Sequence, residues 1–192
     1  MLSQSMIISV IVLLSYGLGS LTGAYYVVKW LSGVDIRKLG SGNVGATNAG
    51  RALGKKGFLL TLLIDAGKVI FALTITSLLV EGEGFLVLSS IFVMLGHVFP
   101  VQLGFHGGKG VVAYLATALF FCPFSIAIFA LAMGITLSIF RKYKLAGFLS
   151  MTTIPVTVYV IEGSFSLSTG LLMLFLVVLL LHKRSLHQSV DT

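Results

Sequence analysis

Long apolar runs separated by short polar segments dominate the chain. Five of these runs come close to the length of about 20 residues that a transmembrane helix needs. They cover residues 6–28, 57–80, 85–103, 145–161 and 167–181. A further run, 110–140, is too long for one ordinary crossing, and Pro123 inside it disfavours a continuous helix. We therefore predict two helices there, and an all-α, seven-helix transmembrane bundle that forms a single domain over residues 1–192.

The composition supports the membrane assignment. Hydrophobic residues make up 57% of the 192 residues and charged residues only 10%, whereas soluble domains carry about 25% charged residues. The first apolar run is too long for the core of a signal peptide, so we expect it to be retained. The single cysteine, Cys122, excludes an internal disulfide and a cysteine-rich metal site.

The distribution of charge predicts the orientation of the bundle. The net charge of +7 could indicate a nucleic-acid partner, but the basic residues of membrane proteins gather on the cytoplasmic side whatever their ligand. With seven helices, Glu81, Glu83 and Glu162 fall on one side of the membrane. The basic residues on the other side are Lys29, Arg37, Lys38, Arg51, Lys55, Lys56, Lys109, Arg141, Lys142, Lys144, Lys183 and Arg184. The positive-inside rule therefore places the N-terminus outside and the C-terminus in the cytoplasm, with no need for a nucleic acid.

The densest polar stretch covers residues 40–51, which we expect to be a loop because it is too rich in glycine for a helix interior and too polar to face lipid. Its glycines allow backbone N–H groups to converge into an anion-binding nest. They are Gly40, Gly42 and Gly45. Their spacing matches the dinucleotide-binding fingerprint, but that fingerprint needs a preceding strand. Further donors are Ser41, Asn43, Thr47 and Asn48, and the planar guanidinium of Arg51 suits a phosphate.

An alternative explanation needs no ligand at this stretch. The glycines would then only permit tight turns, and the nearby basic residues would only face anionic lipid headgroups. Those residues are Arg37, Lys38, Lys55 and Lys56.

A second glycine-and-base segment, Gly107-Gly108-Lys109, precedes the helix predicted over residues 110–122. With about 13 residues at about 1.5 Å each, that helix reaches only about 20 Å. Its start should therefore lie below the membrane surface, where lipid and water-soluble reactants can meet. Unpaired N–H groups and the helix dipole favour an anion there. It is not a Walker A loop, since Gly110 occupies the required Ser or Thr position, so ATP or GTP hydrolysis is not supported.

A few polar residues lie within the predicted helices. His97 could be a general base or phosphate ligand, or a structural hydrogen-bond donor. Asp65 and Lys68 lie one helical turn apart, and either form an ion pair or place Lys68 in an anionic cavity. Gly19 and Gly23 predict a close helix–helix contact. No set of residues has the spacing of a metal site.

These motifs resemble the bacterial glycerol-3-phosphate acyltransferases that use acyl phosphate as donor, the PlsY family. The matching segments are GSGNVGATNAGR at 40–51, Asp65-Ala-Gly-Lys68, Gly96-His97-x-x-Pro100 and Phe105-x-Gly-Gly-Lys-Gly-Val111. The resemblance covers nearly the whole chain. It implies transfer of a fatty acyl group from acyl phosphate to the 1-hydroxyl of glycerol 3-phosphate, which gives lysophosphatidic acid and inorganic phosphate in phospholipid synthesis.

The resemblance also implies where the enzyme works and which residues it uses. The site would face the cytoplasm from the bacterial cytoplasmic (inner) membrane, without metal, cofactor or coenzyme A. Backbone N–H groups near residues 41–43 would hold the donor phosphate, one of whose oxygens accepts the hydroxyl proton. The expected catalytic residues are Ser41, Asn43, Arg51, Lys109 and His97. The expected substrate-binding residues are Gly40, Gly42, Gly45, Thr47, Asn48, Lys68, Gly107, Gly108, His182 and Ser185.

The chain departs from the family pattern in three places. Ser185 stands three residues after His182, where asparagine is expected, and Ala113 stands where threonine is expected. Lys144 and Gly147 replace serines that flank Leu-Ala. These departures concern the acceptor pocket, so a non-catalytic or divergent paralogue that binds lipid phosphates is an alternative. A small anion transporter is another, although it predicts polar residues along several spans and often an inverted repeat.

Overall fold

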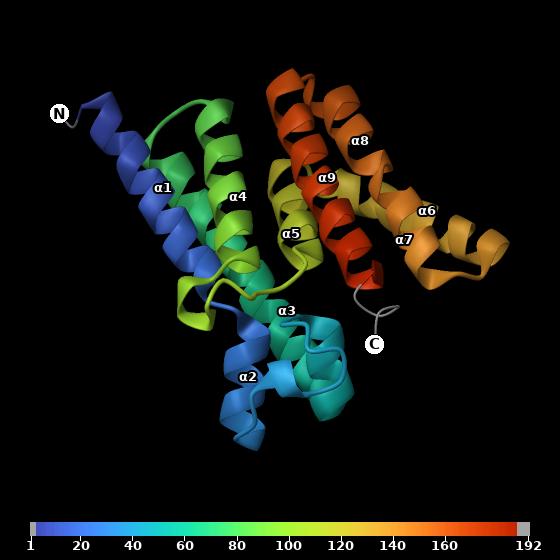
Figure 1. The fold of residues 1–192 in the computed structure, drawn as a ribbon. Helices are drawn as coiled ribbons and strands as arrows, with labels where there is room; N and C mark the ends of the chain where they lie inside the picture. The colour runs from blue at the N-terminus through green and yellow to red at the C-terminus, as the bar shows by residue number, and fades with distance from the viewer. Residues whose placement is uncertain (1–2, 188–192) are drawn as a thin grey trace. The chain divides into compact units, whose positions relative to one another are not determined.

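The structure, a computed structural model, describes residues 3–187, with side chains for residues 3–183. Every element in this range is a helix (Figure 1), and the chain divides into two compact units. Unit 1 (Met1–Ala113) contains α1 (Gln4–Ser20), α2 (Gly23–Ser32), the 3-10 helix η1 (Ile36–Lys38), α3 (Ala46–Leu79), α4 (Glu83–Val98) and η2 (Val101–Leu103). Unit 2 (Tyr114–Thr192) contains most of α5 (Val111–Phe121), then α6 (Pro123–Phe140), α7 (Tyr143–Met151), α8 (Thr153–Glu162) and α9 (Phe165–His187).

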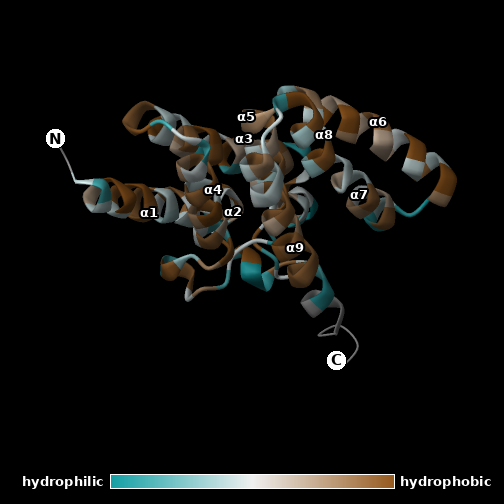
Figure 2. Ribbon diagram, turned by 90° about the horizontal axis from the view of Figure 1, so that it is seen from above, coloured by the Kyte–Doolittle hydropathy of each residue, from teal (hydrophilic) through white to brown (hydrophobic). Residues whose placement is uncertain are grey.

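Within residues 3–187, six helical segments are long and apolar enough to cross a membrane. They are Gln4–Ser32, Ala46–Leu79, Glu83–Leu103, Pro123–Phe140, Tyr143–Glu162 and Phe165–Lys183. Hydrophobic residues dominate these helices (Figure 2), and large apolar side chains such as Leu13, Leu63 and Leu78 are exposed, as lipid-facing positions require. With 11 residues, α5 is too short to be counted with them. The seventh span and the orientation of the termini therefore stay predictions.

The break predicted at Pro123 is confirmed, because α5 ends at Phe121 and α6 begins at Pro123. A proline at the first position of a helix costs no hydrogen bond. Two other runs that we predicted as single helices are each broken. The first run divides into α1 and α2 at Leu21 and Thr22, and the run 145–161 divides into α7 and α8 at Thr152.

The break between α7 and α8 accompanies a proline in the first turn of α8. Pro155 has no N–H, so the carbonyl of Met151, four residues earlier, loses its helical partner. The hydroxyl of Tyr114 donates to that carbonyl at 3.1 Å, and the Tyr114 ring packs against Phe175 at a centroid distance of 6.0 Å. Tyr114 is fully buried. The freed carbonyl thus anchors α5 within unit 2.

The expectation of a loop over residues 40–51 is wrong for its second half. Gly45 has an extended backbone and forms the N-cap of α3, which begins at Ala46. Ala49 belongs to a buried apolar cluster together with Val44, and alanine is the best helix former. Gly54, with φ 65° and ψ −156°, then interrupts α3. A short helix over residues 46–53 therefore precedes the part of α3 that crosses the membrane.

Glycines allow α1 and α2 to approach their neighbours closely, as predicted for Gly19 and Gly23. A Cβ at Gly19 would overlap the backbone of Val93 in α4, and a Cβ at Gly23 would lie 3.1 Å from the carbonyl oxygen of Thr61 in α3. Gly96 of α4 is equally close to the backbone of α1. Figure 1 shows α1 and α4 side by side. The predicted packing surface is confirmed, and it contacts two different helices.

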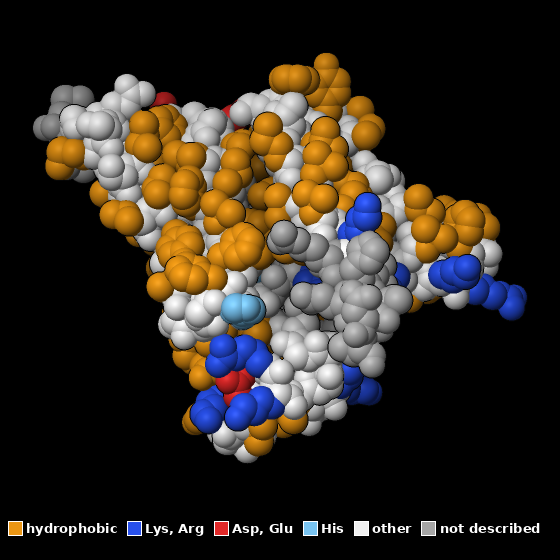
Figure 3. Space-filling model, viewed as in Figure 1, with side chains coloured by type: hydrophobic (Ala, Val, Ile, Leu, Met, Phe, Trp, Pro, Cys, Tyr) orange, Lys and Arg blue, Asp and Glu red, His pale blue; other side chains and the backbone are white. Residues whose placement is uncertain are grey.

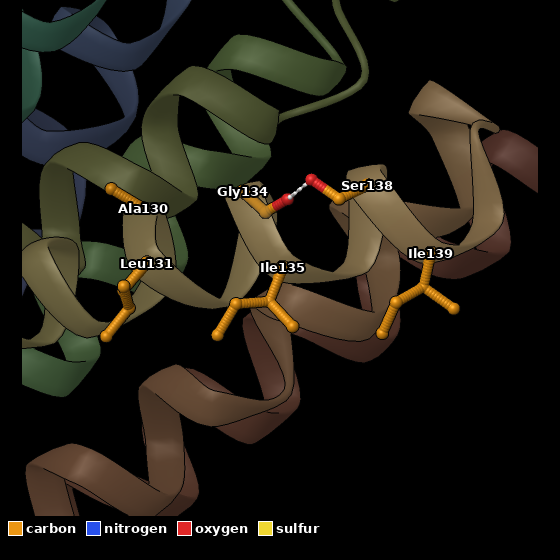
Figure 4. Close-up of a pocket in the computed structure, with 6 residues that line it drawn as sticks. All are labelled: Ala130, Leu131, Gly134, Ile135, Ser138 and Ile139. Atoms are coloured by element: carbon orange, nitrogen blue, oxygen red, sulfur yellow. Dashed lines mark hydrogen bonds between the residues drawn. The ribbon is translucent and has the colours of Figure 1, made fainter.

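Helix α6 of unit 2 is largely exposed along one face. This face carries a shallow depression of about 460 Å³ (Figure 4). Its lining residues are Ala130, Leu131, Gly134, Ile135, Ser138 and Ile139. The hydroxyl of Ser138 donates to the carbonyl of Gly134 at 2.8 Å, so the lining offers few unpaired polar groups. Such a surface suits contact with lipid tails.

We expect Gly19→Ala to destabilise unit 1, because its new methyl group would overlap the Val93 carbonyl of α4. Overpacking of this kind costs about 1–3 kcal/mol. Gly17→Ala on the same helix is the matched control, since a Cβ there meets nothing within 4 Å. Thermal unfolding in detergent should show a lower midpoint for Gly19→Ala only. Equal midpoints for the two variants would contradict the close α1–α4 contact.

Candidate active site

The glycine-rich loop is built around the side chain of Asn48. This side chain is buried, and its Nδ2 donates to the carbonyls of Leu39 at 2.9 Å and Asn43 at 3.1 Å. Its Oδ1 accepts the backbone N–H of Ser41 at 3.1 Å. Gly40 lies so close to this oxygen that no side chain fits, and its φ is 55°. The amide of Asn48 is therefore engaged by the loop itself.

The backbone N–H groups of the loop are partly engaged as well. The N–H of Ser41 is bound by Asn48, and the N–H of Gly42 donates to the carbonyl of Leu39 at 2.9 Å. These contacts do not support the expectation that the N–H groups of Ser41 and Gly42 hold a phosphate, which stays a prediction. The N–H of Asn48 donates to the carbonyl of Gly45 at 3.0 Å, whereas the N–H groups of Ala46 and Thr47 lack helical partners by the geometry of a helix start. They follow the loop directly and offer donors to an anion.

Several side chains of this stretch reach the surface. Ser41, Thr47 and Arg51 are exposed, whereas Asn43 is half-buried. A Cβ at Gly40 would lie 4.0 Å from Cδ of Arg51, so the stem of Arg51 runs beside the loop. Two hydroxyl groups and one guanidinium are thus available to a ligand next to the glycine turns.

A second glycine loop lies against the end of α4. The N–H groups of Gly107 and Gly108 donate to the carbonyls of Val98 and His97, each at 3.0 Å. A Cβ at Gly107 would lie 2.6 Å from Cδ of Pro100. Only glycine fits this position without a shift of the backbone, which explains the residue type.

Gly108 is the point where the two glycine loops meet. A Cβ at this position would lie 2.7 Å from the carbonyl oxygen of Val44 in the first loop, and closer still to Nε2 of His97. Lys109 follows directly and is half-buried, and Gly110, with φ 79°, leads into α5. Unit 1 therefore brings the glycine-rich loop, His97 and the segment that carries Lys109 to one place.

A buried ionic cluster lies behind this meeting point. Nζ of Lys68 is 3.0 Å from Oδ1 of Asp65 and 3.0 Å from Nδ1 of His97, and it donates to the carbonyls of Gly19 and Leu21 at 2.8 Å each. The side chains of Lys68 and Asp65 are 4% and 1% exposed. The ion pair that we predicted as one alternative is confirmed. Lys68 has four protein partners, so this placement does not support the prediction that it binds substrate.

The remaining predicted residues lie in α9 of unit 2. His182 is half-buried, with Nδ1 2.8 Å from the carbonyl of Val178 and its ring against Phe148 at 5.0 Å. The side chain of Ser185 lies outside the described residues. Among the side chains that are described, no group of three or more His, Cys, Asp or Glu could hold a metal ion.

One contact was missed by the interpretation of the sequence, which gave Arg37 a contact only in the alternative that the basic residues face lipid headgroups. Arg37 pairs with Asp35 at 2.6 Å, donates to the carbonyl of Leu103 at 3.1 Å and lies over the Tyr25 ring. These hydrogen bonds hold the pKa of the Asp35 carboxyl below its usual value, and the carboxylate raises the pKa of Arg37. The contact fastens η1 to η2, and so connects the segments before the two glycine loops. Asp35 as the N-cap of η1 was the available signal.

Comparisons with known proteins agree on one family. The family model described as glycerol-3-phosphate acyltransferase matches residues 9–191. Glycerol-3-phosphate acyltransferase 1 of Desulfitobacterium hafniense is 36% identical over 177 residues, which cover 92% of this chain and 88% of that protein. Glycerol-3-phosphate acyltransferase of Agrobacterium fabrum is 41% identical over 149 residues, which cover 78% of this chain and 72% of that protein.

Solved structures show the same similarity. The crystal structure of PlsY, an integral membrane glycerol 3-phosphate acyltransferase, in its glycerol 3-phosphate form has a TM-score of 0.82 and 28% sequence identity. The match covers 96% of this chain and 92% of that one. The lysophosphatidic acid form has a TM-score of 0.78 and 29% identity. The all-helical integral membrane fold of this chain is therefore shown.

We expect Asn48→Ala to disorder the glycine-rich loop, because the carbonyls of Leu39 and Asn43 and the N–H of Ser41 lose their partner. An unpaired buried polar group costs about 1–3 kcal/mol. Hydrogen exchange of the backbone amides of residues 36–45 should accelerate, and the midpoint of unfolding should fall. Thr47→Ala, at the exposed neighbouring position, is the control for stability. Unchanged exchange in Asn48→Ala would show that the loop holds its shape without this side chain.

Proposed function

The chain belongs to the glycerol-3-phosphate acyltransferase family, and we propose that it transfers a fatty acyl group from acyl phosphate to the 1-hydroxyl of glycerol 3-phosphate. The products are lysophosphatidic acid and inorganic phosphate, and no coenzyme A takes part. The observation that carries this proposal is the meeting of two glycine-and-base loops at Gly108. Both reactants carry a phosphate, so a site for this reaction needs two neighbouring anion-binding segments.

For this reaction the protein mainly has to position the two substrates. The acceptor hydroxyl oxygen attacks the carbonyl carbon of the acyl phosphate, and the bond from this carbon to the phosphate oxygen breaks. An oxygen of the leaving phosphate takes the hydroxyl proton, so charges and atoms balance without a separate base. Acyl phosphate is already an activated mixed anhydride. Orientation and electrostatic stabilisation can therefore supply most of the acceleration.

Polar groups of the first loop are proposed to hold the donor phosphate. Ser41 contributes its hydroxyl and Asn43 its side-chain amide, together with the first N–H groups of α3. Arg51 and Lys109 hold the phosphate of glycerol 3-phosphate, since a guanidinium and an ammonium group both form charge-assisted hydrogen bonds to phosphate. The contribution of Thr47 from the first loop, and that of His182 and Ser185 to the acceptor, remain predictions from the family resemblance.

We propose that the site faces the cytoplasm from the bacterial cytoplasmic membrane. In unit 1, Lys and Arg gather at the end that carries α2 and η1, beyond the hydrophobic surface of α1 and α4 (Figure 3). The residues concerned include Lys29, Arg37 and Lys38, all exposed. Under the positive-inside rule this end is cytoplasmic. Seven crossings with the N-terminus outside would put all the basic connections on that side.

We expect purified protein to release phosphate from palmitoyl phosphate only when glycerol 3-phosphate is present. Palmitoyl-CoA with glycerol 3-phosphate should yield no lysophosphatidic acid, because the site is proposed to take an acyl phosphate and no coenzyme A. Phosphate release and the lipid product are measured in the same reaction. Substrate binding without phosphate release would favour the non-catalytic paralogue, and acylation from palmitoyl-CoA would overturn the donor assignment.

Arg51→Ala should lower kcat/KM for glycerol 3-phosphate by roughly 10- to 150-fold, because a charge-assisted hydrogen bond contributes about 1.5–3 kcal/mol. Lys55→Ala is the matched control, since Lys55 is also an exposed cation of α3 and lies beyond Gly54. Initial rates over a range of glycerol 3-phosphate concentrations provide the measurement. Equal losses in the two variants would indicate a general effect of surface charge rather than a contact to substrate.

A further inference from the structure

The first membrane segment is broken at Leu21 and Thr22, within a stretch of 29 residues that is apolar enough to cross a membrane. A break leaves carbonyl groups at the end of α1 and N–H groups at the start of α2 without helical partners. The residues on both sides of the break, Gly19, Ser20, Thr22 and Gly23, are buried, so protein groups must pair these carbonyl and N–H groups. Asp65 and Lys68, from one turn of α3, pair three of them, and the side-chain amide of Gln102 donates to the carbonyl of Ser20.

The charges of these two residues match the two helix ends. Lys68 donates to the carbonyls of Gly19 and Leu21 at the end of α1, at 2.8 Å each. Oδ1 of Asp65 accepts the N–H of Gly23 at the start of α2, at 3.0 Å. A cation at a helix C-terminus and an anion at an N-terminus are both favoured by the helix dipole. The buried pair therefore stabilises a break that lipid alone would penalise.

The same ammonium group lies beside one ring nitrogen of His97. Nζ of Lys68 lies 3.0 Å from Nδ1 of His97, and the carboxylate of Asp65 at 3.0 Å balances its charge. An ammonium group can donate hydrogen bonds but cannot accept them. A proton on Nδ1 would face the ammonium group at 3.0 Å and be repelled by it, and the carboxylate oxygen of Asp65, at 3.7 Å from Nδ1, is too far to accept it. We therefore infer that Nδ1 is the acceptor, which leaves the proton of the neutral ring on Nε2. A general base at Nε2 would need that nitrogen without a proton.

The Nε2 side of the His97 ring faces the second glycine loop. Nε2 lies where a Gly108 side chain would begin, and the backbone carbonyl of His97 accepts the Gly108 N–H at 3.0 Å. The carbonyl of Val44 closes the other side of Gly108. The His97 ring is therefore a spacer of defined orientation between α4 and the loop that carries Lys109.

We propose that Lys68 is a positioning residue for the acyl-transfer site. It caps the break in the first membrane segment and holds His97 with Nδ1 as acceptor and Nε2 as donor. Through this ring it sets the position of Gly108, and with it Lys109, relative to Val44. Lys68 does not contact substrate, and His97 is not a general base. The catalytic consequence rests on the proposed function, whereas the tautomer of His97 does not.

The tautomer can be observed directly by NMR of protein with 13C- and 15N-labelled histidine in detergent. The chain has four histidines, and the signal lost in His97→Gln identifies His97. We expect a neutral ring with the proton on Nε2 in the unaltered protein. A proton on Nδ1, or on both nitrogens, overturns the proposal without any further variant. Lys68→Met should change the His97 nitrogen shifts, and Lys55→Met, at an exposed lysine, should leave them unchanged.

A double-mutant cycle tests whether Lys68 acts through His97. The variants Lys68→Met, His97→Gln and their combination are compared by kcat/KM for glycerol 3-phosphate, with unfolding midpoints recorded for each. We expect the double variant to lose no more than the larger single loss, because both substitutions break the same connection. Losses that multiply would show an independent role for Lys68 and overturn the proposal. If the unaltered protein transfers no acyl group, the proposed function fails while the tautomer result still stands.

Discussion

The structure depends on a constraint of the membrane, namely that each backbone polar group at membrane depth must find a protein partner. The break between α1 and α2 meets this constraint through Asp65 and Lys68. Lys68 can reach the carbonyls of α1 because glycines let the helices of unit 1 approach closely, Gly19 against α4 and Gly23 against α3. Close packing thus brings the buried charges within hydrogen-bond distance of the helix ends that they pair.

The two glycine loops are likewise held in place by hydrogen bonds from the protein itself. The first loop is held from inside by Asn48, and the second is held against α4 by backbone hydrogen bonds from Gly107 and Gly108. Arg37 ties the segments that precede the loops through the carbonyl of Leu103. A reaction accelerated mainly by positioning needs such prior order, because groups that must be arranged during the reaction add to its barrier.

The helices could be predicted because length and apolar content are local properties of the sequence. The break at Pro123 was visible for the same reason. Pro155 offered a similar signal, since a proline in the first turn marks a helix start. The break at Leu21 and Thr22 had no such signal, because neither residue excludes a helix. It is stabilised by Asp65 and Lys68, which lie more than 40 positions away in the sequence. Contacts between residues so far apart cannot be predicted from the local pattern of apolar and polar residues.

The sequence singled out the polar residues of the site more reliably than it assigned their roles. A polar side chain in an apolar chain has either a structural partner or a ligand, and the residue type alone does not distinguish these cases. Burial does. Asn48 and Lys68 are surrounded by groups of the protein itself, whereas Ser41 and Arg51 are exposed beside the same loops. A residue whose donors are already engaged can act on a substrate only by placing another residue. Asn48 and Lys68 are therefore best understood as support for the segments that carry the exposed residues.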